Sequence, residues 1–172
     1  RYTAPLSDKG DVVYSLFRSA LFQINPEAAH DLTINSLQIL GHCLGALRPM
    51  QGRACEVAGL RFANPIGLAA GLDKDAQAVS GLSRLGFGHL EVGTVTPRAQ
   101  SGNPKPRVFR LEKDTALINR LGFNNAGIDV LVARLSKQNY QGVIGVNIGK
   151  NKDTPNDAAY RDYVICIKKA AF

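Results

Sequence analysis

The chain has few cysteines, no tryptophan and no long hydrophobic run. Its three cysteines, Cys43, Cys55 and Cys166, lie too far apart for a Cys-x-x-Cys metal or redox pair, and an odd number cannot all form disulfides within one chain. We therefore expect a reducing compartment. No stretch approaches the roughly 18 consecutive apolar residues of a membrane span, and the sequence shows no basic-then-apolar signal pattern, which predicts a soluble or peripheral protein.

A strong excess of one charge is also missing. Among 172 residues, 21 Lys and Arg face 14 Asp and Glu, a formal net charge of +7, with 45% hydrophobic and 20% charged residues. This composition excludes a disordered tail, a collagen-like repeat and a small disulfide scaffold. The basic residues Lys105, Arg107 and Arg110 belong to a proline-rich loop rather than a basic helix, so we expect no nucleic-acid partner. His30 has no second His or Cys at ligand spacing, so we expect no metal site.

The first part of the chain has a helical pattern. Residues 1–11 are polar and aperiodic, and we expect a disordered or cloning-derived start there. Apolar residues then recur over 12–22 at the spacing of one helix stripe. Asn25-Pro26-Glu27 supplies an N-cap, a first-turn proline and an acid near the positive helix end, which predicts a second helix that ends near Gly45. Its apolar residues recur at threes and fours: Ala29, Leu32, Leu37, Leu40 and Leu44. Residues 12–49 thus form a two-helix extension.

From residue 50 to residue 172, short apolar runs alternate with helical patterns. We expect a small hairpin over 55–62, turned at Ala58-Gly59, and a long loop rich in Pro and Arg before the second helix. The main elements are predicted as strands over 66–69, 89–94 and 143–148 and helices over 75–85, 127–135 and 156–171, the first helix with Ala76, Val79, Leu82 and Leu85 inward. This order predicts an α/β fold with a parallel sheet, either doubly wound or barrel-like.

Each predicted strand is followed by a loop of small and basic residues, over 69–74, 93–97 and 149–152. Small residues let a planar or phosphorylated ligand approach the backbone, and Lys74 and Lys150 can neutralise an anion. Alternatively, the glycines only make turns and the lysines are solvated. The glycine spacings fit neither a P-loop nor a dinucleotide-binding fingerprint.

The segment from Asn119 to Asn125 is dense in amides around a glycine and an aromatic ring. Asparagine side chains both donate and accept hydrogen bonds, as a heterocycle with alternating carbonyl and N–H groups requires. The other interpretation is that Asn124 or Asn125 caps a helix.

Five sequence motifs extend these observations, at residues 64–74, 91–97, 102–110, 119–125 and 146–151. Their order and spacing resemble dihydroorotate dehydrogenase of the membrane-associated, quinone-using class, from about Val12 to the end of the chain. The resemblance implies an FMN-containing (β/α)8 barrel that oxidises dihydroorotate to orotate in pyrimidine synthesis. Only about the first three βα units of such a barrel can form here, preceded by the two-helix extension.

The resemblance also implies roles for particular residues. The substrate-binding group is Lys74, Asn119, Arg120, Leu121, Gly122 and Phe123. The FMN-binding group is Ala70, Gly71, Leu72, Asp73, Lys74, Thr94 and Asn147. Orotate is a planar anion with amide-like edges, which suits one ammonium group and several amides, and the flavin supplies the hydride acceptor that side chains cannot.

The two N-terminal helices resemble a quinone-site lid, with His30 and Arg110 at positions that line the quinone tunnel. Apolar helix faces at a bilayer surface give peripheral attachment without a spanning helix, at the cytoplasmic face of the inner membrane in a bacterium. In the family, a serine after the fourth barrel strand is the base. We expect that strand to lie outside these 172 residues, so no catalytic residue is assigned within the chain. The alternative hypothesis is a non-catalytic half-barrel that acts as a binding or assembly module.

Overall fold

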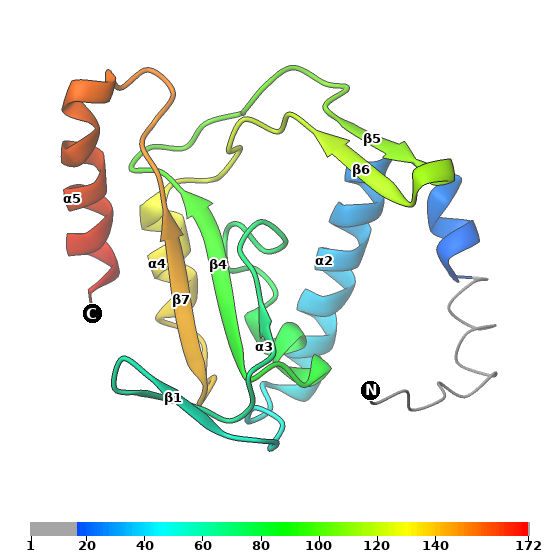
Figure 1. Cartoon of the computed structure of the whole chain (residues 1–172), viewed down its shortest axis with the longest axis vertical. Helices are drawn as coiled ribbons and strands as arrows, with labels where there is room; N and C mark the ends of the chain where they lie inside the picture. Colours follow the sequence, from blue (N-terminus) through cyan, green and yellow to red (C-terminus); the bar gives the residue numbers. More distant parts are fainter. Residues whose placement is uncertain (1–16, 172) are drawn as a thin grey trace.

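A three-stranded parallel sheet lies at the centre of the structure, a computed structural model that describes residues 17–171. Strands β3 (Gly67–Leu68), β4 (His89–Val95) and β7 (Val143–Ile148) are arranged in the order β3-β4-β7. Both pairings are parallel, so the predicted α/β fold with a parallel sheet is confirmed. The arrowheads of β4 and β7 point to the same end of the sheet, as Figure 1 shows.

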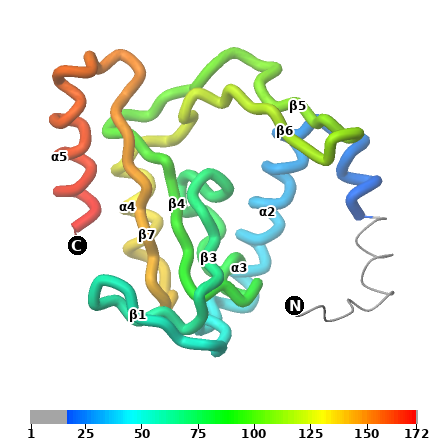
Figure 2. Tube along the Cα trace, in the orientation of Figure 1, coloured from blue at the N-terminus to red at the C-terminus, as the bar shows by residue number. Residues whose placement is uncertain are grey.

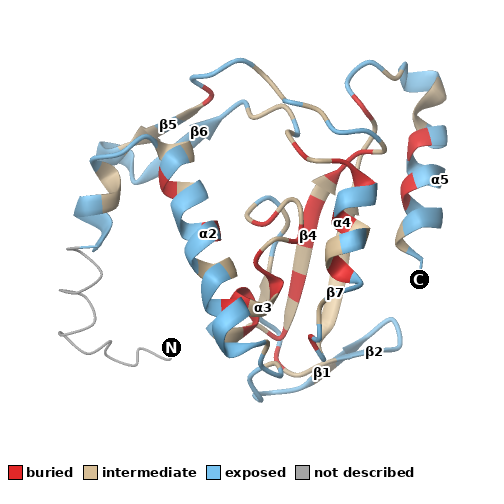
Figure 3. Cartoon of the chain, turned by 180° about the vertical axis from the view of Figure 1, so that it is seen from behind, coloured by how far each residue is buried: buried red, intermediate tan, exposed pale blue. Residues whose placement is uncertain are grey.

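Helices cover one face of this sheet. Helix α3 (Val79–Leu82) continues into the 3-10 turn η1 (Ser83–Leu85), and α4 (Ile128–Leu135) lies beside it on the same face (Figure 3). The 3-10 turn η3 (Asn156–Ala158) leads into α5 (Ala159–Ala170). The hydrophobic core lies between the helices and β4, and includes Leu82, Leu90, Val92, Ile128 and Leu131. Because strand side chains alternate, the other face of β4 carries the polar residues.

Helix α2 (Pro26–Leu44) packs against α3 through glycines. The predicted N-cap is confirmed, because Asn25 Oδ1 accepts hydrogen bonds from the backbone N–H groups of Glu27 (2.9 Å) and Ala28 (3.4 Å). A Cβ atom added at Gly81 would lie 2.0 Å from the Leu37 carbonyl oxygen. The two backbones therefore touch. Among residues 17–171, no helix is both long and apolar enough to cross a bilayer.

The predicted apolar stripe of α2 is only partly buried. Ala29 is buried as expected, but Leu32, Leu40 and Leu44 are exposed, and the core contact runs through Ile34 and Gly41. Periodicity marks apolar positions, but it does not show that a glycine contact will select the packed side. Residues 17–22 are helical, whereas positions 12–16 of the predicted first helix lie outside the described residues.

Two further element predictions are corrected by the structure. The predicted helix over 75–85 becomes regular only at Val79, because Ala76 has a left-handed φ of 54°. Leu85 at its end, which was predicted to point inward, is 55% exposed. The predicted buried strand over 66–69 shortens to β3, and Ile66 is exposed. Strand β3 is the edge of the described sheet and has one neighbour, so only one side of it is paired.

The long loop predicted after β4 contains a hairpin. Strands β5 (Val108–Leu111) and β6 (Ala116–Asn119) are antiparallel and are joined through the 3-10 turn η2 (Glu112–Asp114). All four residues of β6 are exposed, so the strand has no alternation of buried and exposed positions to reveal it in the sequence. The predicted first hairpin is confirmed as β1 (Cys55–Val57) with β2 (Leu60–Phe62). Figure 2 places the β5–β6 hairpin beside the N-terminal end of α2.

The contact between α2 and α3 leads to a stability prediction. Gly81→Ala should lower the free energy of unfolding by about 1–3 kcal/mol, because the added methyl group overpacks a site where backbone meets backbone. Urea denaturation measures this change. Ser36→Ala, on the exposed side of α2, is the matched control and should unfold at nearly the native midpoint. Equal midpoints for both variants would contradict the close helix contact.

Candidate functional site

A cavity of about 740 Å³ lies between α2, the loop after β3, and the β5–β6 hairpin with the segment that follows it. Its lining brings together residues to which the family resemblance gives separate functions. The substrate and flavin groups contribute Gly71, Leu72, Asp73, Lys74, Asn119 and Leu121, and the quinone group contributes His30 and Arg110. This volume is in the range of small-molecule sites.

The loop after β3 is held by a buried carboxylate. Asp73 is almost fully buried, and its two carboxylate oxygens accept hydrogen bonds from the backbone N–H groups of Gln77 and Ala78, both at 2.8 Å. Burial raises the pKa of Asp73, while these two hydrogen bonds act in the opposite direction. The resemblance implies a flavin-binding role for Asp73, and its observed contacts shape the turn that presents Lys74.

Lys74 lies in this cavity with a polar partner from another loop. Its Nζ donates to Asn124 Oδ1 at 2.9 Å. Burial lowers the pKa of the Lys74 ammonium group, and the positive charge of Arg107 lowers it further, whereas the carboxylates of Glu27 and Asp75 raise it. A partly desolvated cation beside an amide is suited to bind an anion.

A second polar group lies on the exposed face of β4 and β7. The Thr94 hydroxyl donates to Asn147 Oδ1 at 2.6 Å, and Asn147 Nδ2 donates to Glu91 Oε1 at 3.0 Å. Thr94 and Asn147 line a second cavity of about 560 Å³, together with Gly122 and Phe123. The predicted site residues are thus divided between two cavities, except Ala70 and Arg120, which line neither, and the 119–125 segment contributes to both cavities.

Within that segment, the asparagines have different roles. Asn124 faces Lys74, whereas Asn125 is buried and does not point into a cavity. The residue that caps α4 is Gly127, so the predicted helix cap by Asn124 or Asn125 is wrong, although Asn125 Oδ1 accepts from the Gly127 N–H at 2.9 Å. Asn119 and Arg120 are exposed.

A buried amide network was missed by the sequence reasoning. Asn125 Nδ2 donates to the Thr96 hydroxyl at 2.9 Å, and Asn151 Nδ2 donates to the same oxygen at 3.1 Å. Asn151 Nδ2 also lies 3.0 Å from Gln100 Oε1, and the Asn151 N–H donates to Asp162 at 2.8 Å. The only signal in the sequence was that Asn125 ends the amide-rich 119–125 segment and Asn151 lies within the predicted 149–152 loop. The network joins the loops after β4, β6 and β7.

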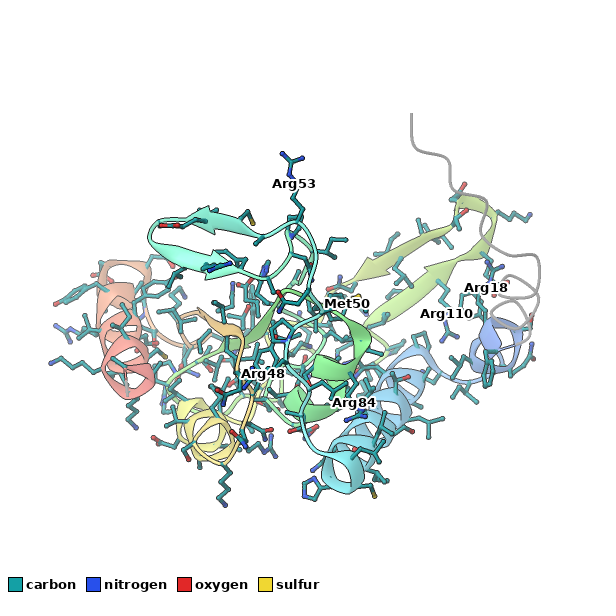
Figure 4. All side chains as sticks on the ribbon, turned by 90° about the horizontal axis from the view of Figure 1, so that it is seen from below. Arg18, Arg48, Met50, Arg53, Arg84 and Arg110 are labelled. Atoms are coloured by element: carbon teal, nitrogen blue, oxygen red, sulfur yellow. The ribbon has the colours of Figure 1, made fainter. Side chains whose placement is uncertain are left out.

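His30 and Arg110 connect the N-terminal helices to the rest of the site. His30 Nε2 donates to the Leu72 carbonyl at 2.6 Å. Arg110 donates to the backbone carbonyls of Phe22 (3.2 Å) and Ile24 (2.7 Å), and its guanidinium lies 4.5 Å from the centre of the Phe22 ring. Figure 4 shows Arg110 beside the helical segment 17–22, close to Arg18. The cavity wall near α2 is therefore tied to the turn that carries Lys74.

A parallel βα sheet with a lysine and several amides in the loops near its strand ends defines an α/β protein whose candidate site is suited to a small anionic molecule. The chain belongs to the dihydroorotate dehydrogenase family, because the family model described as Dihydroorotate dehydrogenase matches residues 53–171.

Individual relatives agree with this assignment. Dihydroorotate dehydrogenase (quinone) of Aromatoleum aromaticum is 52% identical over 158 residues, which are 92% of this chain and 45% of the relative. The Aeromonas hydrophila protein of the same name is 54% identical over 92% of this chain and 48% of its own length. The ligand-free DHODH structure from Eimeria tenella has a TM-score of 0.72 at 45% identity, covering 86% of this chain and 43% of its own. The chain spans about half the length of these relatives.

The turn around Asp73 can be tested by an isosteric change. Asp73→Asn replaces one acceptor oxygen by an NH₂ group, which leaves either the Gln77 or the Ala78 N–H without its partner. An unpaired buried donor should lower the free energy of unfolding by about 1–3 kcal/mol, measured in urea. Asp153→Asn is the control, because that carboxylate is exposed and forms a surface ion pair with Arg98, and the change should alter stability little. A native-like Asp73→Asn variant would show that the two hydrogen bonds do not hold the turn.

Proposed function

We propose that the polypeptide with this sequence oxidises (S)-dihydroorotate to orotate, with FMN as the hydride acceptor and a quinone as the final electron acceptor, in pyrimidine biosynthesis. The observation that carries the proposal is the single cavity lined by Lys74 and Asn124 as well as by His30 and Arg110. A dehydrogenase that passes electrons from an anionic substrate to a quinone needs substrate-binding residues and quinone-binding residues near the same redox group. The relatives named dihydroorotate dehydrogenase (quinone) support the same reaction.

The residues at the strand ends fit a flavin. Gly71 has a φ of 111°, and a Cβ atom there would meet open space, so a flat ring can approach the backbone at the cavity. Thr94 and Asn147 offer a hydroxyl and an amide to a ring edge that carries carbonyl and N–H groups. FMN, when bound, supplies the hydride acceptor for substrate oxidation. Gly71, Lys74, Thr94 and Asn147 would hold it, with Ala70, Leu72 and Asp73 shaping the same turn.

The substrate would be held by charge and by amides. Orotate and dihydroorotate carry one carboxylate and amide-like ring edges, which match the Lys74 ammonium group and the side chains of Asn119 and Asn124. The backbone of Leu121, Gly122 and Phe123 follows the same border between the two cavities. Desolvation of Lys74 strengthens its attraction for an anion, because an ion pair is stronger in a medium of low dielectric constant.

The quinone would enter beside α2. His30 and Arg110 line the cavity there, and Leu32, Ile39 and Leu40 are exposed apolar residues of the same helix. An apolar helix face at a bilayer surface would give peripheral attachment, on the cytoplasmic side of the inner membrane in a bacterium. We further propose that the three βα units are the first of a (β/α)8 barrel in the full-length polypeptide, since the relatives are about twice as long.

The role of Lys74 is tested in the full-length polypeptide by Lys74→Ala. Loss of a charge-assisted hydrogen bond costs about 1.5–3 kcal/mol, so orotate should bind about tenfold to a hundredfold more weakly, and flavin reduction by dihydroorotate should slow. Titration with orotate and stopped-flow absorbance measure the two effects. Lys137→Ala, at an exposed position after α4, is the control and should match the native protein. Native affinity and reduction rate in Lys74→Ala would exclude this substrate site.

The quinone side is tested by separating the two half-reactions. His30→Ala should slow reoxidation of the reduced flavin by quinone about tenfold, the effect of roughly one lost hydrogen bond. It should affect flavin reduction far less, because the lysine and amide groups remain. His42→Ala, at an exposed position in the last turn of α2, is the control. Equal slowing of both half-reactions would assign His30 to the loop that carries Lys74 and not to the quinone.

A further inference from the structure

Arg107 and Glu27 form a largely buried ion pair between α2 and the segment that precedes β5. Their side chains are 7% and 14% exposed. Arg107 Nε and Nη2 both donate to Glu27 Oε1, at 3.0 and 2.9 Å. Glu27 belongs to the first turn of α2, three residues before His30. The pair thus anchors the end of the helix that faces the cavity.

The same guanidinium also holds the segments that border the substrate side. Arg107 Nη1 donates to the backbone carbonyls of Ser101 (2.7 Å) and Asn103 (2.9 Å), and more weakly to that of Leu121 (3.4 Å). All three nitrogen atoms of the guanidinium therefore have protein partners. Arg107 is thus bound on both sides by protein groups, which suits a residue that acts on a ligand through the segments it holds.

We propose that Glu27 and Arg107 are a positioning pair, which fixes the first turn of α2 to the loop segments at Ser101, Asn103 and Leu121 and keeps the charge around Lys74 balanced. The inference rests on the proposed function, since it concerns the same anion site. As a consequence, α2 on the proposed quinone side and the loops on the proposed substrate side are held together by the same ion pair. Neither Glu27 nor Arg107 needs to touch the reacting atoms.

Charges from several elements surround Lys74. Glu27 and Asp31 belong to α2, Asp75 belongs to the same turn as Lys74, and Arg107 precedes β5. His30 of α2 lines the same cavity. Removing the negative charge of Glu27 leaves Arg107 unbalanced, so the pKa of Lys74 falls further. Removing the positive charge of Arg107 leaves Glu27 unbalanced, so the pKa of Lys74 rises.

The test uses Glu27→Gln, Arg107→Gln and the double variant in the full-length polypeptide. The pKa of Lys74 is measured by NMR of the labelled lysine side chain, which is assigned with Lys74→Arg, and requires no activity. The two single variants should shift this pKa in opposite directions, and the double variant should return it toward the native value. A purely structural pair would shift it the same way in both. The double variant also keeps the test decisive if Arg107→Gln alone fails to fold.

Orotate affinity supplies the second readout. The double variant should bind orotate about tenfold more weakly than the native protein even where Lys74 is fully charged, because the loop has lost its tether. Lys105→Gln is the matched control, since Lys105 approaches Glu27 Oε2 at 3.7 Å but is 65% exposed, and it should leave both readouts unchanged. Shifts of the Lys74 pKa in one direction, or native orotate affinity in the double variant, would overturn the proposal. Absence of orotate binding to the native protein would instead refute the proposed function, while the NMR result would still decide the pairing of Glu27 with Arg107.

Discussion

The hydroxyl oxygen of Thr96, just beyond the end of β4, accepts hydrogen bonds from the side-chain amides of Asn125 and Asn151, which come from two loops far apart in the sequence. A buried amide without a partner is costly, so each loop is held to the position where its asparagine reaches this oxygen. The site depends on that constraint. Thr94, two residues before Thr96, faces Asn147 in a cavity, and Asn124, next to Asn125, faces Lys74. Thr94 and Asn124, which we propose contact ligands, therefore lie within two residues of Thr96 and Asn125, which are buried and hydrogen-bonded.

The β5–β6 hairpin extends this fixed frame to the N-terminal helices. Arg107 and Arg110 are three residues apart, and each uses its guanidinium on a different helical segment. Arg107 pairs with Glu27 in the first turn of α2, whereas Arg110 binds carbonyls of residues 21–24. Arg107 and Arg110 therefore fix the position of the N-terminal helical segments relative to the β5–β6 hairpin. His30 adds a contact from α2 to the Leu72 carbonyl in the loop after β3.

The sequence predicted the fold where a local rule was sufficient. The parallel sheet, the Asn25 cap and the first hairpin follow from periodicity, capping chemistry and turn residues, and all three are confirmed. The β5–β6 hairpin did not follow, because an exposed strand has no buried face to produce alternation. Before the late start of α3, the buried Asp73 carboxylate accepts hydrogen bonds from the backbone N–H groups of Gln77 and Ala78. The burial of Asp73 depends on the tertiary structure, so no local sequence pattern predicts it.

The candidate site was similarly divided. Loop composition pointed to Lys74 and to the asparagines of 119–125, and the structure brings Lys74 together with Asn124. The distinction between Asn124 and Asn125 was beyond the sequence, because adjacent identical residues differ only in which way the folded loop turns them. The pairing of Glu27 with Arg107 spans 80 residues, and neither residue belongs to a motif that predicts the other.

The close backbone contact between Gly81 and Leu37 means that the two sides of α2 tolerate different substitutions. At Gly41 on the inner line of α2, a Cβ atom would lie 2.6 Å from the backbone nitrogen of Gly81, so this position favours a residue without a side chain. On the outer line, the exposed leucines touch little of the described protein, so they can be exchanged without a change in the fold. The helix can therefore diverge on its outward side, in step with whatever surface it meets, while its inward side preserves the geometry of the site.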